Sequence, residues 1–290
     1  MFPTRIVRQL LAGAALLAGA SAVLAQPLSV EVYNPGESAV FPVASTLISG
    51  ERDAILVDAQ FSTREAQELV ERIQASGKTL TTIFISHGDP DFYFGLDTLT
   101  RAYPEAKVLA TAETVAHIEK SRAPKLAYWG PILKGSAPQR TLVPEVLQGD
   151  SLTLEGQSLE LIGHDPKHTS LWIPSIKTVV GGVLTYANIH PWIADAQTVE
   201  ARQSWLKSLD ELEALQPTML VPGHYLGQPK LNLDDLRFTR DYLLTLEAEL
   251  PKAKDSQSLI AAMKAKYPAL LDASSLELSA KVLKGEMQWP

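Results

Sequence analysis

Along the first half of the chain, short runs of apolar and β-branched residues alternate with turn residues. The runs at 28–33, 42–48 and 53–58 are separated by Asn34-Pro35-Gly36 and Gly50-Glu51-Arg52. This alternation predicts three short strands joined by tight connections.

A helix and a buried strand are expected next. Between 63 and 76 the apolar residues recur every three or four positions, and the run ends at Gly77, which predicts an amphipathic helix. An uninterrupted apolar run at 80–86 leads directly to His87 and predicts a buried strand. The next expected elements are a helix at 94–102, a strand at 107–111 and a helix that starts at 111 and ends by Pro124.

The second half repeats this order after an irregular segment. Residues 123–138 hold three prolines and two glycines and show no period, which predicts a loop or lid. Strands are then expected at 141–146, 151–154, 158–162, 171–173, 178–184 and 218–221, and helices at 198–215 and over most of 233–284. Strands followed by helices, twice over, predict an α/β (α+β) fold in which two mixed sheets pack face to face with helices outside.

The first 25 residues have the pattern of a secretory signal peptide. Arg5 and Arg8 precede the apolar run 10–23, and small residues precede a cleavage point before Gln26. The run is shorter than the roughly 20 residues of a membrane-spanning helix, although an uncleaved anchor is the alternative. We expect export to the periplasm or secretion, with residues 26–290 forming a single domain whose C-terminal part is helical.

Charge and cysteine content narrow the range of partners. Cleavage would leave 24 Lys and Arg residues against 33 Asp and Glu residues, a net charge of −9. Such an acidic surface disfavours nucleic acid and anionic membranes, so the expected partner is a small-molecule substrate. The sequence has no cysteine, so a metal site here has to be built from His, Asp and Glu.

Three segments carry side chains that bind metals, and each follows a predicted strand. The sequence SHGDPDFYFG at 86–95 places His87, Asp89 and Asp91 at alternate positions, which in an extended loop point to one side. The sequence GHDPKHT at 163–169 adds His164, and VPGHY at 221–225 adds His224. An acidic loop after a strand is more often a solvated turn, but three such segments in series favour a metal site.

In order and spacing, residues 40–225 resemble the metallo-β-lactamase superfamily, which includes glyoxalase II and its relatives. That family has a His-x-His-x-Asp-His loop after a strand, a Gly-His turn, a strand ending in a bridging aspartate and a late Pro-Gly-His. An aspartate like Asp58 at the end of an early strand is another of its features. The resemblance implies the four-layer αββα sandwich of the metallo-β-lactamase fold.

The chain departs from the family motif at three positions. Asp89 stands where the family has its second loop histidine, Phe92 where it has the last one, and Gly182 where it has the bridging aspartate. A carboxylate can still bind zinc, but phenylalanine and glycine cannot.

The resemblance therefore implies one complete metal site. His87, Asp89 and His164 match the first site and form a two-His, one-carboxylate set with an open position, as in several catalytic zinc sites. Only Asp91 and His224 remain of the second. We expect one zinc per chain, although iron or manganese suits the same ligands.

Catalytic roles are expected for the two remaining ligands. Asp91 would orient the attacking water or shuttle its proton, and His224 would stabilise an oxyanion or donate to the leaving group. Five further residues are candidates for the pocket wall: Phe92, Tyr93, His168, His190 and Trp192. For His168 a structural role near the metal is favoured, and a role as substitute ligand is the alternative. His190 is equally well explained as a pocket residue or a capped loop residue, and His117 is most simply a surface residue.

The sequence thus predicts an exported hydrolase that cleaves an ester, lactone, thioester or lactam-type bond with one metal-activated water. Two alternatives remain. Loss of the ligands at Phe92 and Gly182 favours a degenerate member that binds without turnover. Redox or oxygen chemistry at the metal is the third interpretation.

Overall fold

The computed structural model describes residues 26–163 and 168–289, and these form two mixed sheets with helices on both outer faces. The first sheet has the strand order β1-β2-β3-β4-β5-β6. Its strands are β1 Ser29–Tyr33, β2 Ser45–Ser49, β3 Asp53–Val57, β4 Thr79–Ile85, β5 Lys107–Ala110 and β6 Glu145–Val146. Strands β1 to β3 pair antiparallel, and β3 to β6 pair parallel.

The second sheet has the order β12-β10-β9-β8-β7, with the β10–β12 pair parallel and the others antiparallel. Its strands are β7 Ser151–Leu154, β8 Gln157–Ile162, β9 Ser170–Ile173, β10 Thr178–Val180 and β12 Met219–Leu220. A separate parallel pair joins β11 (Tyr186–Ala187) to β13 (His224–Tyr225). This short pair places His224 beside Tyr186, in the segment that follows β10 of the second sheet.

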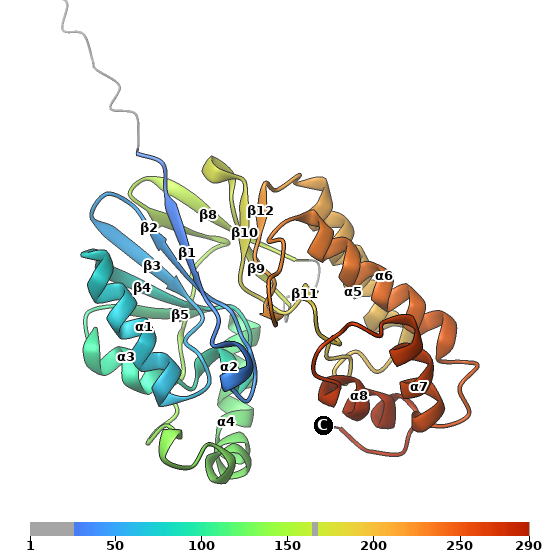
Figure 1. The fold of residues 1–290 in the computed structure, drawn as a ribbon. Helices are drawn as coiled ribbons and strands as arrows, with labels where there is room; N and C mark the ends of the chain where they lie inside the picture. The colour runs from blue at the N-terminus through green and yellow to red at the C-terminus, as the bar shows by residue number, and fades with distance from the viewer. Residues whose placement is uncertain (1–25, 164–167, 290) are drawn as a thin grey trace, which may run out of the picture.

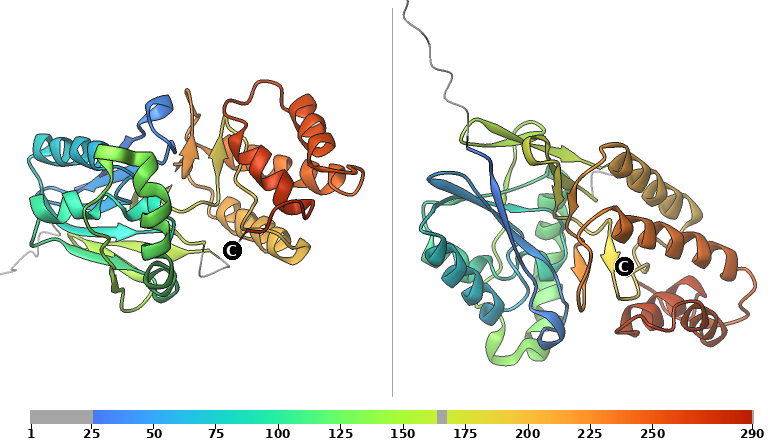
Figure 2. Two further views of the ribbon diagram at one scale, coloured as in Figure 1. Left: turned by 90° about the horizontal axis from the view of Figure 1, so that it is seen from below. Right: turned by 45° about the horizontal axis from the view of Figure 1, so that its top comes forward.

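Helices cover the two outer faces of this pair of sheets. Figure 1 shows α1 and α3 beside the first sheet and α5 to α8 on the opposite side, and the two views in Figure 2 agree. The α-helices are α1 Thr63–Ser76, α2 Pro90–Tyr93, α3 Leu96–Ala102, α4 Ala112–Leu133, α5 Val199–Ala214, α6 Leu233–Glu249, α7 Ser256–Lys266 and α8 Ser274–Leu283. Short 3-10 turns lie at η1 Gly36–Ser38, η2 Lys134–Ser136 and η3 Pro174–Ile176. The predicted four-layer αββα arrangement is confirmed.

Local sequence explains the sharpest helix boundaries. Ser62 caps α1 by accepting a hydrogen bond from the Glu65 N–H, and the Glu65 carboxylate accepts one from the Ser62 N–H. This reciprocal pair satisfies two backbone donors that a helix start leaves open. Gly77 ends the helix at φ 66°, a left-handed conformation that glycine adopts without steric cost.

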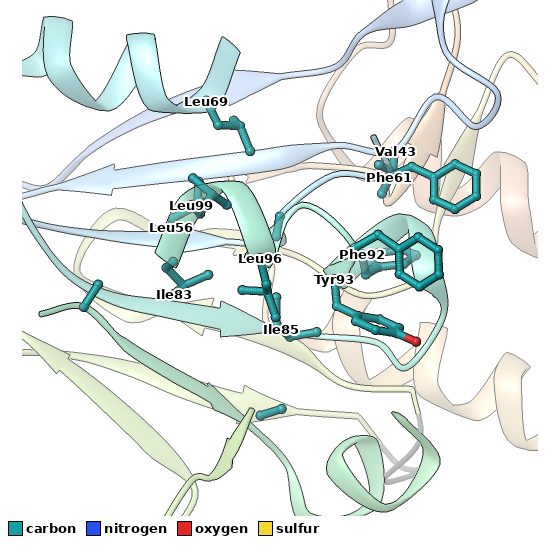
Figure 3. Close-up of a cluster of buried hydrophobic side chains, with 14 of the residues drawn as sticks. Val43, Leu56, Phe61, Leu69, Ile83, Ile85, Phe92, Tyr93, Leu96 and Leu99 are labelled. Atoms are coloured by element: carbon teal, nitrogen blue, oxygen red, sulfur yellow. The ribbon is translucent and has the colours of Figure 1, made fainter. Parts of the chain in front are cut away.

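The core has three parts that follow the layers. Between the sheets, Ile48, Ile55 and Phe84 face Leu159 and Leu171. A second cluster lies under α1 and α3, and a third under α5 to α8. Figure 3 shows the second cluster, with aliphatic side chains at one end and the rings of Phe61, Phe92 and Tyr93 at the other, beside α2.

The loop predicted at 123–138 is wrong over most of its length, because α4 continues through Pro124 and Pro131 to Leu133. Both prolines lie on exposed positions, so water can solvate the carbonyls that lose their partner. Leu126, Trp129 and Leu133 recur at helical spacing and pack against the core under the first sheet. Their burial outweighs the cost of the prolines.

Candidate metal centre and its surroundings

The metal loop starts at the end of β4, where a buried polar network holds the backbone. Both oxygens of the fully buried Asp58 accept hydrogen bonds from Ser86, one from its N–H (2.8 Å) and one from its hydroxyl (2.7 Å). The Ser86 hydroxyl oxygen accepts in turn from the Gly182 N–H at 2.7 Å. Burial raises the pKa of Asp58 to about 7, and the hydrogen bonds from Ser86 oppose the rise. The network fixes the residue before His87 against both sheets.

His87 and Asp89 converge at the start of this loop. His87 Nε2 lies 3.3 Å from Asp89 Oδ2, and the side chains are 13% and 29% exposed. Two ligands on one tetrahedral zinc ion lie about 3.3 Å apart, given metal–ligand distances of about 2.0–2.1 Å. The two side chains are within hydrogen-bonding distance of each other, and this separation is also that of two donors that share one ion.

A cation from α4 completes the surroundings of Asp89. Lys125 Nζ forms an ion pair with Asp89 Oδ1 and lies 3.5 Å from His117 Nε2. Burial opposes ionisation of Asp89, but His87 and Lys125 outweigh it and hold the pKa of this carboxyl well below its ordinary value. Burial would lower the pKa of His87, but the hydrogen bond and charge of Asp89 raise it overall, with help from Asp195.

Lys125 was not among the predicted site residues, because the helix was expected to end at Pro124. The prediction that His117 is a surface residue is only half right. Its side chain is 51% exposed, yet its ring contacts the loop so closely that a Cβ at Gly88 would lie 2.6 Å from it. The helical spacing of Leu126, Trp129 and Leu133 is the signal that would have placed Lys125 on this helix.

Asp91 points elsewhere, because residues 90–93 form the short helix α2 and not an extended loop. Its Oδ2 lies 2.7 Å from His224 Nε2, a direct hydrogen bond between two side chains that are 8% and 12% exposed. The Tyr186 ring stacks on His224 at 5.6 Å. His224 Nδ1 is buried, and no side chain or backbone group of the described residues hydrogen-bonds to it. The predicted convergence of all three loop side chains is thus wrong for Asp91.

Phe92 separates the two histidine–aspartate pairs. Its ring centroid lies 5.2 Å from that of His87 and 5.4 Å from that of His224, with both contacts edge-on. The ring is 1% exposed. An apolar side chain therefore fills the space between the imidazoles.

The position of the family's bridging aspartate is also closed. Gly182 has φ 78°, and a Cβ there would lie 2.3 Å from the Thr169 carbonyl oxygen and 2.8 Å from Ser170 Oγ. A Cβ at Gly223 would lie 2.0 Å from the Gly182 carbonyl oxygen. Two backbone segments thus meet where a bridging side chain would start.

The remaining predicted site residues divide into three groups. His164 lies outside the described residues. The His168 ring stacks on His87 at 5.7 Å, and the indole of Trp192 donates to Asp195, which also accepts from Trp289. Both side chains stay candidates for the site wall.

Two predicted pocket residues are buried in the core. His190 is 2% exposed and shares a 2.9 Å hydrogen bond with the hydroxyl of Tyr242, on the side of α6. Burial lowers the pKa of His190. Tyr93 is fully buried in the cluster of Figure 3. For His190 this is a correction, because its bond to Tyr242 belongs to the core. Tyr93 is buried, but Asp89 lies near enough to help burial raise its pKa, so its place beside the site stays a prediction.

The described His, Asp and Glu side chains can be compared with the ligand set that a metal ion requires. Among residues 26–163 and 168–289, no three His, Asp or Glu side chains are grouped closely enough to hold one ion. His87 and Asp89 have the spacing of two ligands, and the third predicted ligand is His164. His87 and Asp89 could serve as two ligands of one zinc ion, whereas Asp91 and His224 are hydrogen-bonded directly to each other at 2.7 Å.

Comparisons with known proteins agree with this fold. The family model of the metallo-beta-lactamase superfamily matches residues 39–224. A metallo-beta-lactamase family protein from Thermus thermophilus superposes with a TM-score of 0.61 at 18% identity, over 90% of this chain and 93% of that one. The DIM-1 metallo-beta-lactamase gives a TM-score of 0.53 at 17% identity, over 77% of this chain and 99% of that one.

A relative of similar sequence is a hydroxyacylglutathione hydrolase from Synechococcus sp. (strain ATCC 27144 / PCC 6301 / SAUG 1402/1). It is 30% identical over 129 residues, which are 43% of this chain. The match spans 40% of that relative's length. The chain belongs to the metallo-beta-lactamase superfamily, a family made up typically of metal-dependent hydrolases that generally bind zinc.

Proposed function

We propose that this protein is a metal-dependent hydrolase that holds one metal ion per chain, zinc first and iron or manganese as alternatives. The observation that carries the proposal is the 3.3 Å approach of His87 Nε2 to Asp89 Oδ2 beside a separate, directly bonded Asp91–His224 pair. The first pair offers two ligands, and the second offers proton transfer. We assign the third ligand to His164.

Asp91 and His224 then have separate roles in the proposed hydrolysis. A bound zinc ion supplies Lewis acidity, which acidifies water and polarises a carbonyl. Asp91 accepts a hydrogen bond from His224 Nε2 and so holds the ring in one tautomer, with the lone pair on Nδ1. We propose that the Asp91–His224 pair as a unit takes up a proton during attack and returns it to the leaving group.

The surroundings of the two pairs favour a neutral acyl substrate. The rings of Phe92 and Tyr186 pack on His224 and exclude water from its faces, and the expected mature chain is strongly acidic. We propose an ester, lactone, thioester or lactam-type bond. The Synechococcus relative, named for hydrolysis of a hydroxyacylglutathione, makes a thioester the first to test.

A second candidate function is binding of a small molecule without turnover. The observation in its favour is that Gly182 and Phe92 close the second metal position while Lys125 already neutralises Asp89. Such a protein would keep the fold and a pocket but gain nothing from added metal.

Export remains part of the proposal. We infer that residues 1–25 are removed during secretion to the periplasm or beyond. No helix within the described part of the chain is both long and apolar enough to cross a membrane. Mass spectrometry of the exported protein tests the proposal: an N-terminus at Gln26 supports it, and an intact Met1 contradicts it.

Elemental analysis of gently purified protein, beside a substrate screen with and without chelator, tests the activity. The screen contains an ester, a lactone, a thioester and a β-lactam. One metal per chain with chelator-sensitive hydrolysis supports the hydrolase. Folded, metal-free protein that stays inert after metal addition supports the binding protein instead.

A further inference from the structure

Lys125 is the charged residue that meets the metal loop from α4. It is 36 residues distant from Asp89 in sequence, and the two form an ion pair with side chains that are 26% and 29% exposed. Partial burial weakens the screening of their attraction by solvent and salt. The contact is therefore a stable feature of the loop's surroundings.

The helix is seated on the loop by a second contact. The His117 ring lies over Gly88, where a Cβ would be 2.6 Å from the ring. His117 Nε2 is 3.5 Å from Lys125 Nζ and 4.0 Å from Asp89 Oδ1. Lys125 follows His117 by about two helical turns, so the same face of α4 supplies both contacts.

The two oxygens of Asp89 have different partners. Oδ2 faces His87 Nε2 at 3.3 Å, and Oδ1 meets the ammonium of Lys125. Because Lys125 holds Oδ1, only Oδ2 is turned toward the space beside His87. Asp89 is thus arranged to offer one donor atom, as an imidazole does.

The negative charge of Asp89 is the reason why its pairing with Lys125 matters for a metal site. A neutral imidazole ligand adds no charge to a metal site, whereas a carboxylate adds one negative charge. The ammonium of Lys125 cancels that charge within hydrogen-bonding distance. The other nearby carboxylate of the loop, Asp91, is paired with His224.

We propose that Lys125 is a positioning residue that acts as the counter-charge of Asp89, so that the Asp89–Lys125 pair presents a metal ion with one oxygen donor and no net charge. The inference rests on the proposed function, in which His87 and Asp89 hold the metal. It goes further because it assigns part of the zinc affinity of that site to Lys125, which lies outside the metal loop.

Zinc dissociation constants of metal-free protein, measured by competition with a chromophoric chelator, test the assignment. The set is the wild type, Lys125→Met, Asp89→His and the double variant, whose residue pairs carry charges of 0, −1, +1 and 0. We expect Lys125→Met to bind zinc about tenfold more tightly, because the uncompensated carboxylate attracts the cation. Asp89→His should bind about tenfold more weakly, and the double variant should return to within about threefold of wild type.

Two controls separate charge from structure. Lys125→Arg keeps the charge and should stay within about threefold of the wild-type zinc affinity. Lys120→Met removes an exposed lysine from the same helix and should leave zinc affinity unchanged. Thermal unfolding of the metal-free proteins shows whether any variant has lost its fold.

The outcomes are distinct. Weaker zinc binding by folded Lys125→Met, or an unrestored double variant, would overturn the counter-charge role while leaving the hydrolase proposal in place. Absence of zinc binding in every protein, the wild type included, would overturn both proposals together.

Discussion

Two histidine–aspartate pairs with different geometry meet at the segment 87–91. His87 and Asp89 lie 3.3 Å apart, beside a lysine and near the stacked ring of His168. Asp91 and His224 lie 2.7 Å apart, enclosed by aromatic rings. The first pair is the one that we propose as a metal site, whereas the second is a shorter hydrogen bond enclosed by rings.

The difference arises from what surrounds each pair. At the first pair Lys125 binds one oxygen of Asp89, and the His87 ring lies 3.3 Å from the other oxygen. At the second pair no Lys or Arg of the described residues pairs with Asp91, and the Phe92 ring lies between the two imidazoles. Residue type alone is thus a poor guide to the geometry of such a pair.

Breaking the first pair should have the largest effect. His87→Ala removes one of two described donors, so metal affinity should fall by at least about 100-fold and hydrolysis with it. Dissociation constants from chelator competition measure the loss. His190→Gln, at a histidine in the core, is the matched control and should bind metal normally; unchanged binding by His87→Ala would exclude this residue as a ligand.

Breaking the second pair should affect turnover alone. Asp91→Asn removes the carboxylate that orients His224, and kcat should fall by about 100- to 1000-fold. Metal affinity should stay within about threefold of wild type. Steady-state kinetics with added metal measure the first quantity, and a parallel drop in bound metal would show Asp91 to be a ligand.

Restoring the bridging residue should fail. In Gly182→Asp the new side chain meets the Thr169 carbonyl oxygen, and the unfolding free energy should fall by about 2–3 kcal/mol. Gly130→Ala, where nothing lies within 4 Å of a new Cβ, is the control and should not be destabilised. Denaturant unfolding gives the numbers, and a stable variant that gains a second metal would contradict the packing described.

The smallest expected effect concerns His190, which the structure places in the core. Burial lowers the pKa of His190 from 6.5, so the unfolded chain takes up a proton at a higher pH than the folded one. Its contribution to stability is present above pH 6.5 and is lost as pH falls through the lowered pKa. Relative to His190→Gln, the wild type should lose up to about 1 kcal/mol between pH 6.5 and 5.5. Equal pH dependence of the two proteins in urea unfolding would count against burial as the cause.

Most strands of the two sheets and the first helix could be predicted because their signals are local, although β6 and β10 are shorter than expected. The helix α1 (Thr63–Ser76) has its cap, its apolar stripe and its terminal glycine in one stretch, and its predicted limits are confirmed. The extent of α4 could not be predicted from Pro124, since its burial against the first sheet decided the outcome. The pair β11–β13 joins segments almost 40 residues apart and leaves no pattern in two residues each.

The candidate site was predictable in its residues and less so in its geometry. Strand ends located His87 and Asp89, and the order of the motifs located His224. The partners of Asp89 and Asp91 come from α4 and β13, which only the tertiary fold brings to the loop. The role of Gly182 is a matter of close backbone approach, which a single letter in the sequence does not reveal.

Metal stoichiometry in three proteins tests most directly whether Asp89, and not Asp91, binds the metal. Wild type, Asp89→Asn and Asp91→Asn are loaded with zinc, freed of excess by gel filtration and analysed for zinc per chain. Because Asp89 is the proposed ligand, we expect about one zinc per chain in the wild type and in Asp91→Asn, and close to none in Asp89→Asn. Two zinc ions in the wild type, or equal loss in both variants, would contradict the division of the loop into one metal-binding pair and one hydrogen-bonded pair.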